Sequence, residues 1–107
     1  MTTFDKREEG FEKRFALDEE SRFKALARRN KKLGLWAAEK LGLAGEAAEA
    51  YAKEVVVADL EEAGDEDVFR KLRSDFDAKG VDVSDHQIRR SMDEFLAAAA
   101  AEVKSAG

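Results

Sequence analysis

The 107-residue sequence contains no cysteine and no proline, and it has a single histidine. Without cysteine, the chain has no disulfide framework, no thiolate metal site and no Cys-His catalytic pair. No apolar run approaches the ~20 residues that span a bilayer, and no signal peptide is visible. We therefore expect a soluble, cytoplasmic protein that is not an enzyme.

Hydrophobic residues make up 44% of the chain and charged residues 40%. A composition rich in Ala, Glu, Lys, Leu and Arg is typical of an all-α protein. At this length the chain is expected to form one small domain whose core draws on most of its elements.

Apolar residues at helical spacing, together with start and stop signals, predict a four-helix bundle. The apolar face of the first helix includes Phe23 and Leu33, and that of the second includes Tyr51 and Leu60. The four helices are expected at residues 21–41, at 45–63, from the N-cap Asp65 to Gly80, and from the N-cap Ser84 through Val103.

Helix termini are also marked in the sequence. Ser21 is expected to cap the first helix, and Gly42 to end it in a left-handed conformation. Ser84 and Gln87 have the spacing of a capping box. The glycines of GLWAAEKLGLAG are interpreted as punctuation at helix ends.

The segment 1–20 differs from the rest of the chain. On a helix, Phe4, Phe11 and Phe15 would fall within roughly 40° of one another and form one narrow apolar stripe. Gly10 interrupts it at a cost of ~1 kcal/mol relative to alanine, and an isolated helix of this length is marginal in water. We therefore predict a flexible N-terminal arm that becomes helical on a partner.

The division predicted from these patterns is an arm at 1–20 and a helical domain at 21–107. Charge supports it, because residues 1–32 carry a net charge of +3 and residues 33–107 a net charge of −8. The stretch from Arg22 to Lys32 contains no acid. It is interpreted as a solvated face, as a contact for an anionic protein surface, or as a nucleic-acid contact. Its basic residues are Arg22, Lys24, Arg28, Arg29, Lys31 and Lys32.

Other features give little sign of a cofactor or metal site. The acids around Glu61 and Asp65 lack the ligand pattern of a calcium loop, and no phosphate-binding glycine loop is present. His86 is interpreted as an exposed residue at a helix start, and Trp36 as part of the core. We therefore expect no cofactor and no metal.

Several sequence blocks together are specific to one family. ARRNKKLGLWAAEKLGL is followed by YAKEVV, EEAGDEDVFRK and HQIRRSMDE. With these blocks the chain closely resembles the zeta subunit, the inhibitor of the F-type ATP synthase in alpha-proteobacteria. The resemblance implies a four-helix protein whose N-terminal arm inserts into the catalytic headpiece and blocks ATP hydrolysis. The insertion site would be an interface between catalytic and non-catalytic subunits, near the rotating shaft.

This resemblance gives the arm a partner. The phenylalanine stripe would lie in a groove of the headpiece, and the charges between would select the site. The expected partner-binding residues are Phe4, Arg7, Phe11, Lys13, Arg14 and Phe15. The protein would then be peripheral at the inner membrane through the synthase, without inserting into the membrane.

An alternative function remains open from the sequence. The basic stretch 22–32, close to Trp36 and Tyr51, could form a small nucleotide- or nucleic-acid-binding module. A nucleotide is therefore a second candidate ligand, and nucleic acid is the less expected one because the whole chain is acidic.

Overall fold

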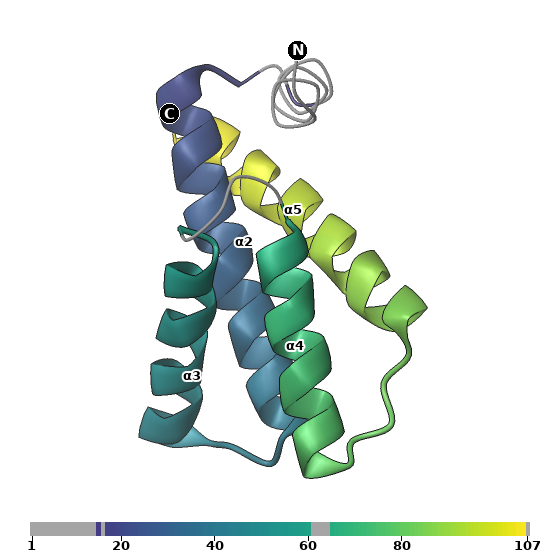
Figure 1. The fold of residues 1–107 in the computed structure, drawn as a ribbon. Coiled ribbons are helices and arrows are strands. Elements are labelled where there is room, and N and C mark those ends of the chain that lie inside the picture. Colours follow the sequence, from purple (N-terminus) through teal and green to yellow (C-terminus); the bar gives the residue numbers. More distant parts are fainter. Residues whose placement is uncertain (1–14, 16, 61–64, 107) are drawn as a thin grey trace.

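The computed structural model describes residues 15, 17–60 and 65–106. Over these residues it contains four helices and no strand (Figure 1): α2 at Glu19–Lys40, α3 at Gly45–Ala58, α4 at Glu66–Lys79 and α5 at Asp85–Ala106. The prediction of an all-α, four-helix fold is confirmed.

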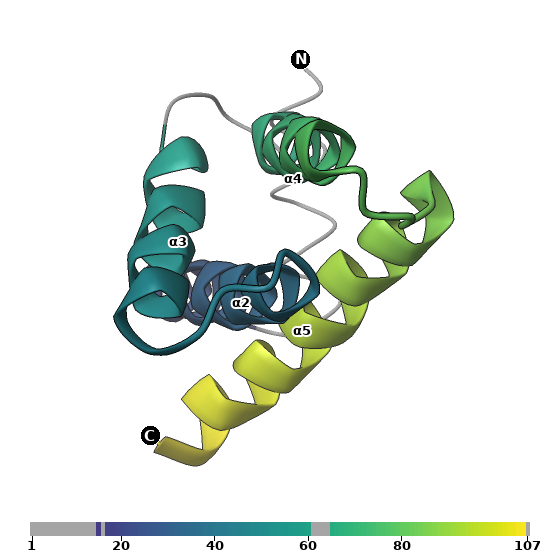
Figure 2. The same cartoon turned by 90° about the horizontal axis from the view of Figure 1, so that it is seen from below.

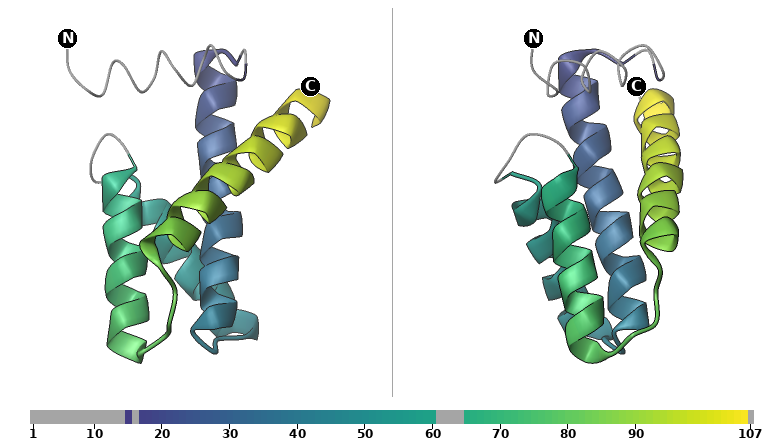
Figure 3. Two further views of the ribbon diagram at one scale, coloured as in Figure 1. Left: turned by 90° about the vertical axis from the view of Figure 1, so that its right-hand side faces the viewer. Right: turned by 45° about the vertical axis from the view of Figure 1, so that its right-hand side comes forward.

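Helix α2 is the central element of the fold. Seen along its axis in Figure 2, it lies between α3 and α5, which are the helices it contacts most. Helix α5 crosses α2 obliquely, so that the end of α5 lies beside the beginning of α2 (Figure 3). The first turns of α2 project beyond the end of α3 (Figure 1).

The main hydrophobic core lies between the four helices. Leu33, Val68, Leu72, Phe76 and Ile88 are fully buried in it. These residues were predicted to form the inner faces of their helices, and that prediction is confirmed. Trp36, which is half-buried, packs against the same core, as expected from the sequence.

The predicted helix ends are correct where a local motif defines them. Gly42 has φ +80°, and the Leu43 N–H donates to the Ala38 carbonyl at 2.9 Å, which closes α2 as in a Schellman motif. At the start of α5, the Ser84 N–H donates to Gln87 Oε1 at 2.9 Å, and the Gln87 N–H donates to Ser84 Oγ at 3.1 Å. The predicted capping box is therefore confirmed.

The second predicted helix was too long. Helix α3 ends at Ala58 instead of residue 63, and residues 61–64 lie outside the described part of the chain. The last turn tightens, because the Leu60 N–H donates to the Val57 carbonyl at 3.0 Å. Leu60 consequently lies past the helix and is 69% exposed, whereas the sequence pattern placed it in the core.

Gly34 was predicted from the sequence to mark a helix end, and that prediction was wrong. It is buried in the middle of α2, where α3 crosses closely. A Cβ atom at this position would lie 2.6 Å from Ala52 Cα and 3.1 Å from Ala52 Cβ. The glycine is needed for the close approach of the two helix backbones.

We expect Gly34→Ala to destabilise the protein. Forcing α2 and α3 apart should cost about 1–3 kcal/mol, which outweighs the gain of up to ~1 kcal/mol in helix propensity. Thermal unfolding followed by circular dichroism measures the change. Ser74→Ala, on the exposed side of α4, is the control for propensity alone. A Gly34→Ala protein as stable as the wild type would show that the helices separate without cost.

Candidate functional site

The junction between arm and domain lies closer to the N-terminus than predicted. Asp18, not Ser21, caps α2: its carboxylate accepts the Ser21 N–H at 2.7 Å, and this hydrogen bond lowers the pKa of Asp18. Leu17 is only 7% exposed and belongs to a hydrophobic cluster, against which Phe15 also packs. Both residues were left out of the core that was predicted from the sequence, and that part of the prediction was wrong. Leu17 to Glu20 belong to the folded domain.

The other arm residues predicted to bind the partner lie outside the described residues. They are Phe4, Arg7, Phe11, Lys13 and Arg14. Their assignment to a partner-binding stripe stays a prediction. Of that set, the structure places only Phe15, which is half-buried at the junction.

The basic stretch of α2 is largely engaged within the domain. Arg28 and Lys32 both bind Glu102 near the end of α5, at 3.3 and 2.6 Å. The hydrogen bond from Lys32 is the main cause of a lowered pKa of Glu102, and Arg28 adds to it. Lys24 pairs with Glu20 on the same helix at 3.3 Å. The pairs of Arg28 and Lys32 with Glu102 join α2 to α5. All three pairs together leave less positive charge for a partner than the sequence suggested.

Arg29 was predicted to belong to a basic contact surface, but it is buried, with 1% exposure. Its Nε donates to Asn30 Oδ1 at 2.7 Å, and its Nη2 lies 2.9 Å from Asp65 Oδ1 and 3.9 Å from Asp59 Oδ1. Asn30 Nδ2 in turn donates to Asp59 Oδ2 at 2.9 Å. This polar network connects α2 to the end of α3 and the start of α4. Arg29 is therefore not available to an anionic surface.

Trp36 contributes to packing as expected. Its ring meets Phe76 edge-on at a centroid distance of 5.9 Å and Phe95 at 6.5 Å, and Lys40 Nζ lies 5.2 Å from its centroid. Tyr51 is buried in the same core. The two aromatic residues proposed as a nucleotide-stacking pair are thus both committed to packing within the domain.

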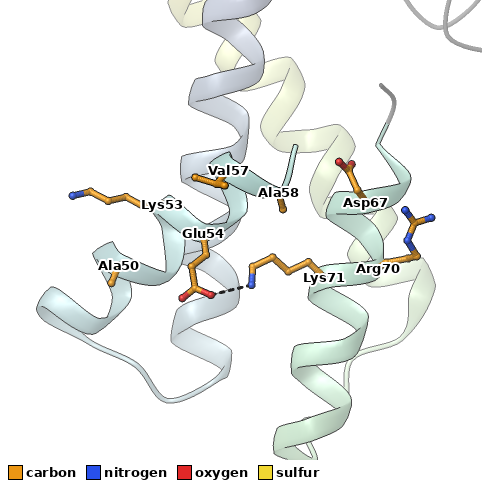
Figure 4. A pocket seen from close by; sticks show the side chains of 8 residues that line it. All are labelled: Ala50, Lys53, Glu54, Val57, Ala58, Asp67, Arg70 and Lys71. Atoms are coloured by element: carbon orange, nitrogen blue, oxygen red, sulfur yellow. Dashed lines mark hydrogen bonds and ion pairs between the residues drawn. The ribbon is translucent and has the colours of Figure 1, made fainter. Parts of the chain in front are cut away.

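A groove lies between α3 and α4, with a volume of about 670 Å³ (Figure 4). Glu54 and Lys71 meet across it, with Lys71 Nζ 3.2 Å from Glu54 Oε1. Lys71 Nζ is also 3.2 Å from Asp75 Oδ2 and 5.0 Å from the Tyr51 ring. These contacts engage Lys71, one of the three basic residues that line the groove together with Lys53 and Arg70.

Tyr51 gives a spectroscopic test of this contact between α3 and α4. Its hydroxyl donates to Asp75 Oδ2 at 2.7 Å. Burial raises the pKa of Tyr51 far above its ordinary value, and the Asp75 hydrogen bond adds to the increase. A raised pKa means that this contribution to stability is complete below the unfolded value of about 10 and declines as the pH rises above it.

Because Tyr51 is the only tyrosine, tyrosinate absorbance reports on this residue alone. We expect the phenolate to appear only together with the loss of helical circular dichroism as the pH is raised. An ordinary phenol titration with the helix content intact would contradict the buried contact.

The sequence pattern missed an exposed aromatic residue. Phe23 was predicted to be buried but is 65% exposed. It lies near the start of α2, whose first turns project beyond the end of α3 (Figure 1). Val57, at the α3–α4 groove, is also exposed.

His86 is exposed in the first turn of α5, as predicted. Residues 15, 17–60 and 65–106 include no group of three or more acidic or histidine side chains placed to hold a metal ion. None of the helices α2 to α5 is long and apolar enough to cross a membrane.

Comparisons with known proteins identify the family. A solution NMR structure is 48% identical in sequence and has a TM-score of 0.69, covering 79% of this chain and 96% of its own. No curated protein matches the chain. The family model described as ATPase inhibitor subunit zeta matches residues 1–102. That span includes both the arm and most of α5. The chain therefore belongs to the ATPase inhibitor subunit zeta family, whose members regulate an enzyme without being one.

Proposed function

We propose that this protein inhibits ATP hydrolysis by the F-type ATP synthase, and that its N-terminal arm acts as a helix inserted into the catalytic headpiece. The observation that carries the proposal is the family match, which begins at residue 1 and therefore includes the arm. The apolar stripe of Phe4 and Phe11 supplies the contact surface. If residues 1–14 form this helix on the partner, it would be about 21 Å long.

The folded domain supports this role by presenting the arm. Asp18 caps α2 and Leu17 is buried beside it, so the structured domain begins immediately after the arm. The arm bases Arg7, Lys13 and Arg14 would select the site and orientation by electrostatic complementarity. Folding on binding costs part of the interaction energy and keeps the inhibition reversible.

The partner then determines where the protein acts. We propose that it is cytoplasmic and is held at the inner membrane only through the synthase headpiece. Exposed Phe23 and Lys24, near the start of α2, would lie close to the headpiece once the arm is inserted.

A nucleotide- or nucleic-acid-binding role has less support. Its basic surface is reduced, because Arg29 is buried and both Arg28 and Lys32 bind Glu102. The aromatic rings of Trp36 and Tyr51 pack within the core. Neither nucleotide binding nor nucleic-acid binding is needed to explain the contacts of the described residues.

The test is ATP hydrolysis by the purified headpiece of the same organism, titrated with the full chain. We expect hydrolysis to fall to a low plateau at one inhibitor per headpiece. Unchanged hydrolysis at a large molar excess would exclude the proposal. Binding of labelled ATP or DNA by the free protein, with a strong salt dependence for DNA, would favour the alternative.

A further inference from the structure

The domain has a second hydrophobic cluster, separate from the main core. Its buried members are Leu17, Ala25, Leu96, Ala99, Ala100 and Val103, and Phe15 and Leu26 pack against them. Apart from Phe15 and Leu17, the members of this cluster come from the start of α2 and the end of α5, where Figure 3 shows these helices side by side. Residues near the two ends of the chain thus meet in one cluster.

Leu17 completes this cluster from the arm side. Apart from Leu96, the buried members on α5 are alanines and a valine, so the leucine is one of the largest side chains available to fill the space. The Asp18 cap fixes the backbone immediately after it, in an extended conformation with φ −75° and ψ 175°. Cap and leucine together hold the chain at a defined position where it leaves the domain.

Ion pairs hold the opposite wall of the cluster in place. Glu102, next to Val103, binds Arg28 and Lys32 of α2. The end of α5 is thereby fixed against α2 by charge on the surface and by apolar contacts beneath it. The position of Leu17 depends on this contact between α2 and α5.

We propose that this cluster is a seat for the base of the inhibitory arm, and that Leu17 and Val103 are positioning residues for inhibition. The proposal rests on the proposed function. A seated base limits the directions in which the arm can leave the domain, and preorganisation of this kind lowers the cost of binding. Leu17 and Val103 are each 7% exposed and belong to the same cluster, so Val103 would act on the arm by supporting the packing of Leu17.

Two buried valines give a matched pair of variants. Val103→Ala loosens the seat, whereas Val83→Ala makes the same change at a residue that is 4% exposed in the main core. Leu17→Ala removes the seated side chain directly. Each variant is assayed against the headpiece at a temperature at which circular dichroism shows it fully folded.

We expect Leu17→Ala and Val103→Ala to weaken inhibition by roughly tenfold, as when several ordered side chains are released before binding, and Val83→Ala by less than about twofold. Amide exchange at Ser21 and Arg22, whose N–H groups donate to Asp18, should accelerate in Val103→Ala but not in Val83→Ala. Equal potency of all four proteins would overturn the seat while leaving the proposed function intact. Equal losses in the two valine variants would also overturn it, because the effect would then follow general stability. No inhibition by the wild type would instead refute the proposed function.

Discussion

Arg29→Ala is expected to lower the free energy of unfolding by about 3–5 kcal/mol, the cost of breaking a buried ion pair by removing one partner. The guanidinium is 1% exposed and lies between Asp65 and Asp59, whose side chain is itself 11% exposed. Without Arg29, Asp59 keeps its negative charge in a largely buried place, beside the neutral amide of Asn30. The deleted side chain would also leave a void beneath the junction of α2, α3 and α4.

Arg28→Ala is the matched control for this variant. Arg28 is adjacent in sequence and also forms an ion pair, but its side chain is 46% exposed. Exposed pairs contribute about 0–1 kcal/mol, so this variant should unfold almost like the wild type. Chemical denaturation of both variants provides the comparison. If the two substitutions cost the same, the network around Arg29 does not hold the helix junction together.

Phe11→Ala is expected to weaken inhibition by roughly thirtyfold or more, because truncating a well-packed aromatic anchor costs ≥2 kcal/mol. The same loss is expected for Phe4→Ala, since both side chains belong to the predicted stripe. The free protein should melt at the wild-type temperature, because the arm is predicted from its sequence to stay outside the core of the helical domain. Inhibition titrations on the headpiece measure the change.

Gly10→Ala is the companion test of the arm's conformation. It should strengthen inhibition severalfold, because alanine favours a helix over glycine by up to ~1 kcal/mol. Weaker inhibition by this variant would mean that the arm bends at Gly10 or binds in a different conformation. Phe11→Ala with unchanged potency would remove the stripe from the mechanism.

Local signals allowed much of the fold to be predicted from the sequence. The Ser84–Gln87 capping box and the Gly42 helix end depend on residues a few positions apart, so their chemistry is visible in the sequence itself. The faces of α4 and α5 were predicted correctly because apolar residues recur with the period of a helix. In each case the neighbours along the chain were sufficient.

Two errors are local, since Asp18 instead of Ser21 caps α2 and α3 ends before residue 63. The others arise where distant segments meet. In the sequence, Arg29 is one of several basic residues in a basic stretch. Its ion pairs form only when the fold brings Asp59 and Asp65, some thirty residues later, next to it. In the same way, Leu17 lies in a weakly apolar segment and becomes buried only because the fold places the end of α5 beside it. Phe23 has the periodicity of a core residue but remains exposed. That the arm binds a partner stays a prediction from its own sequence pattern, whereas the proposed seat at its base could be inferred only from the folded chain.

The most direct test of arm-based inhibition compares the full chain with a fragment of residues 15–107 in the headpiece ATP hydrolysis assay. The fragment keeps Phe15, Leu17 and the Asp18 cap, so it should melt close to the temperature of the full chain. We predict that the full chain inhibits and that the fragment does not, even at a large excess. A folded fragment that inhibits as strongly as the full chain would contradict an inhibitory role for the arm.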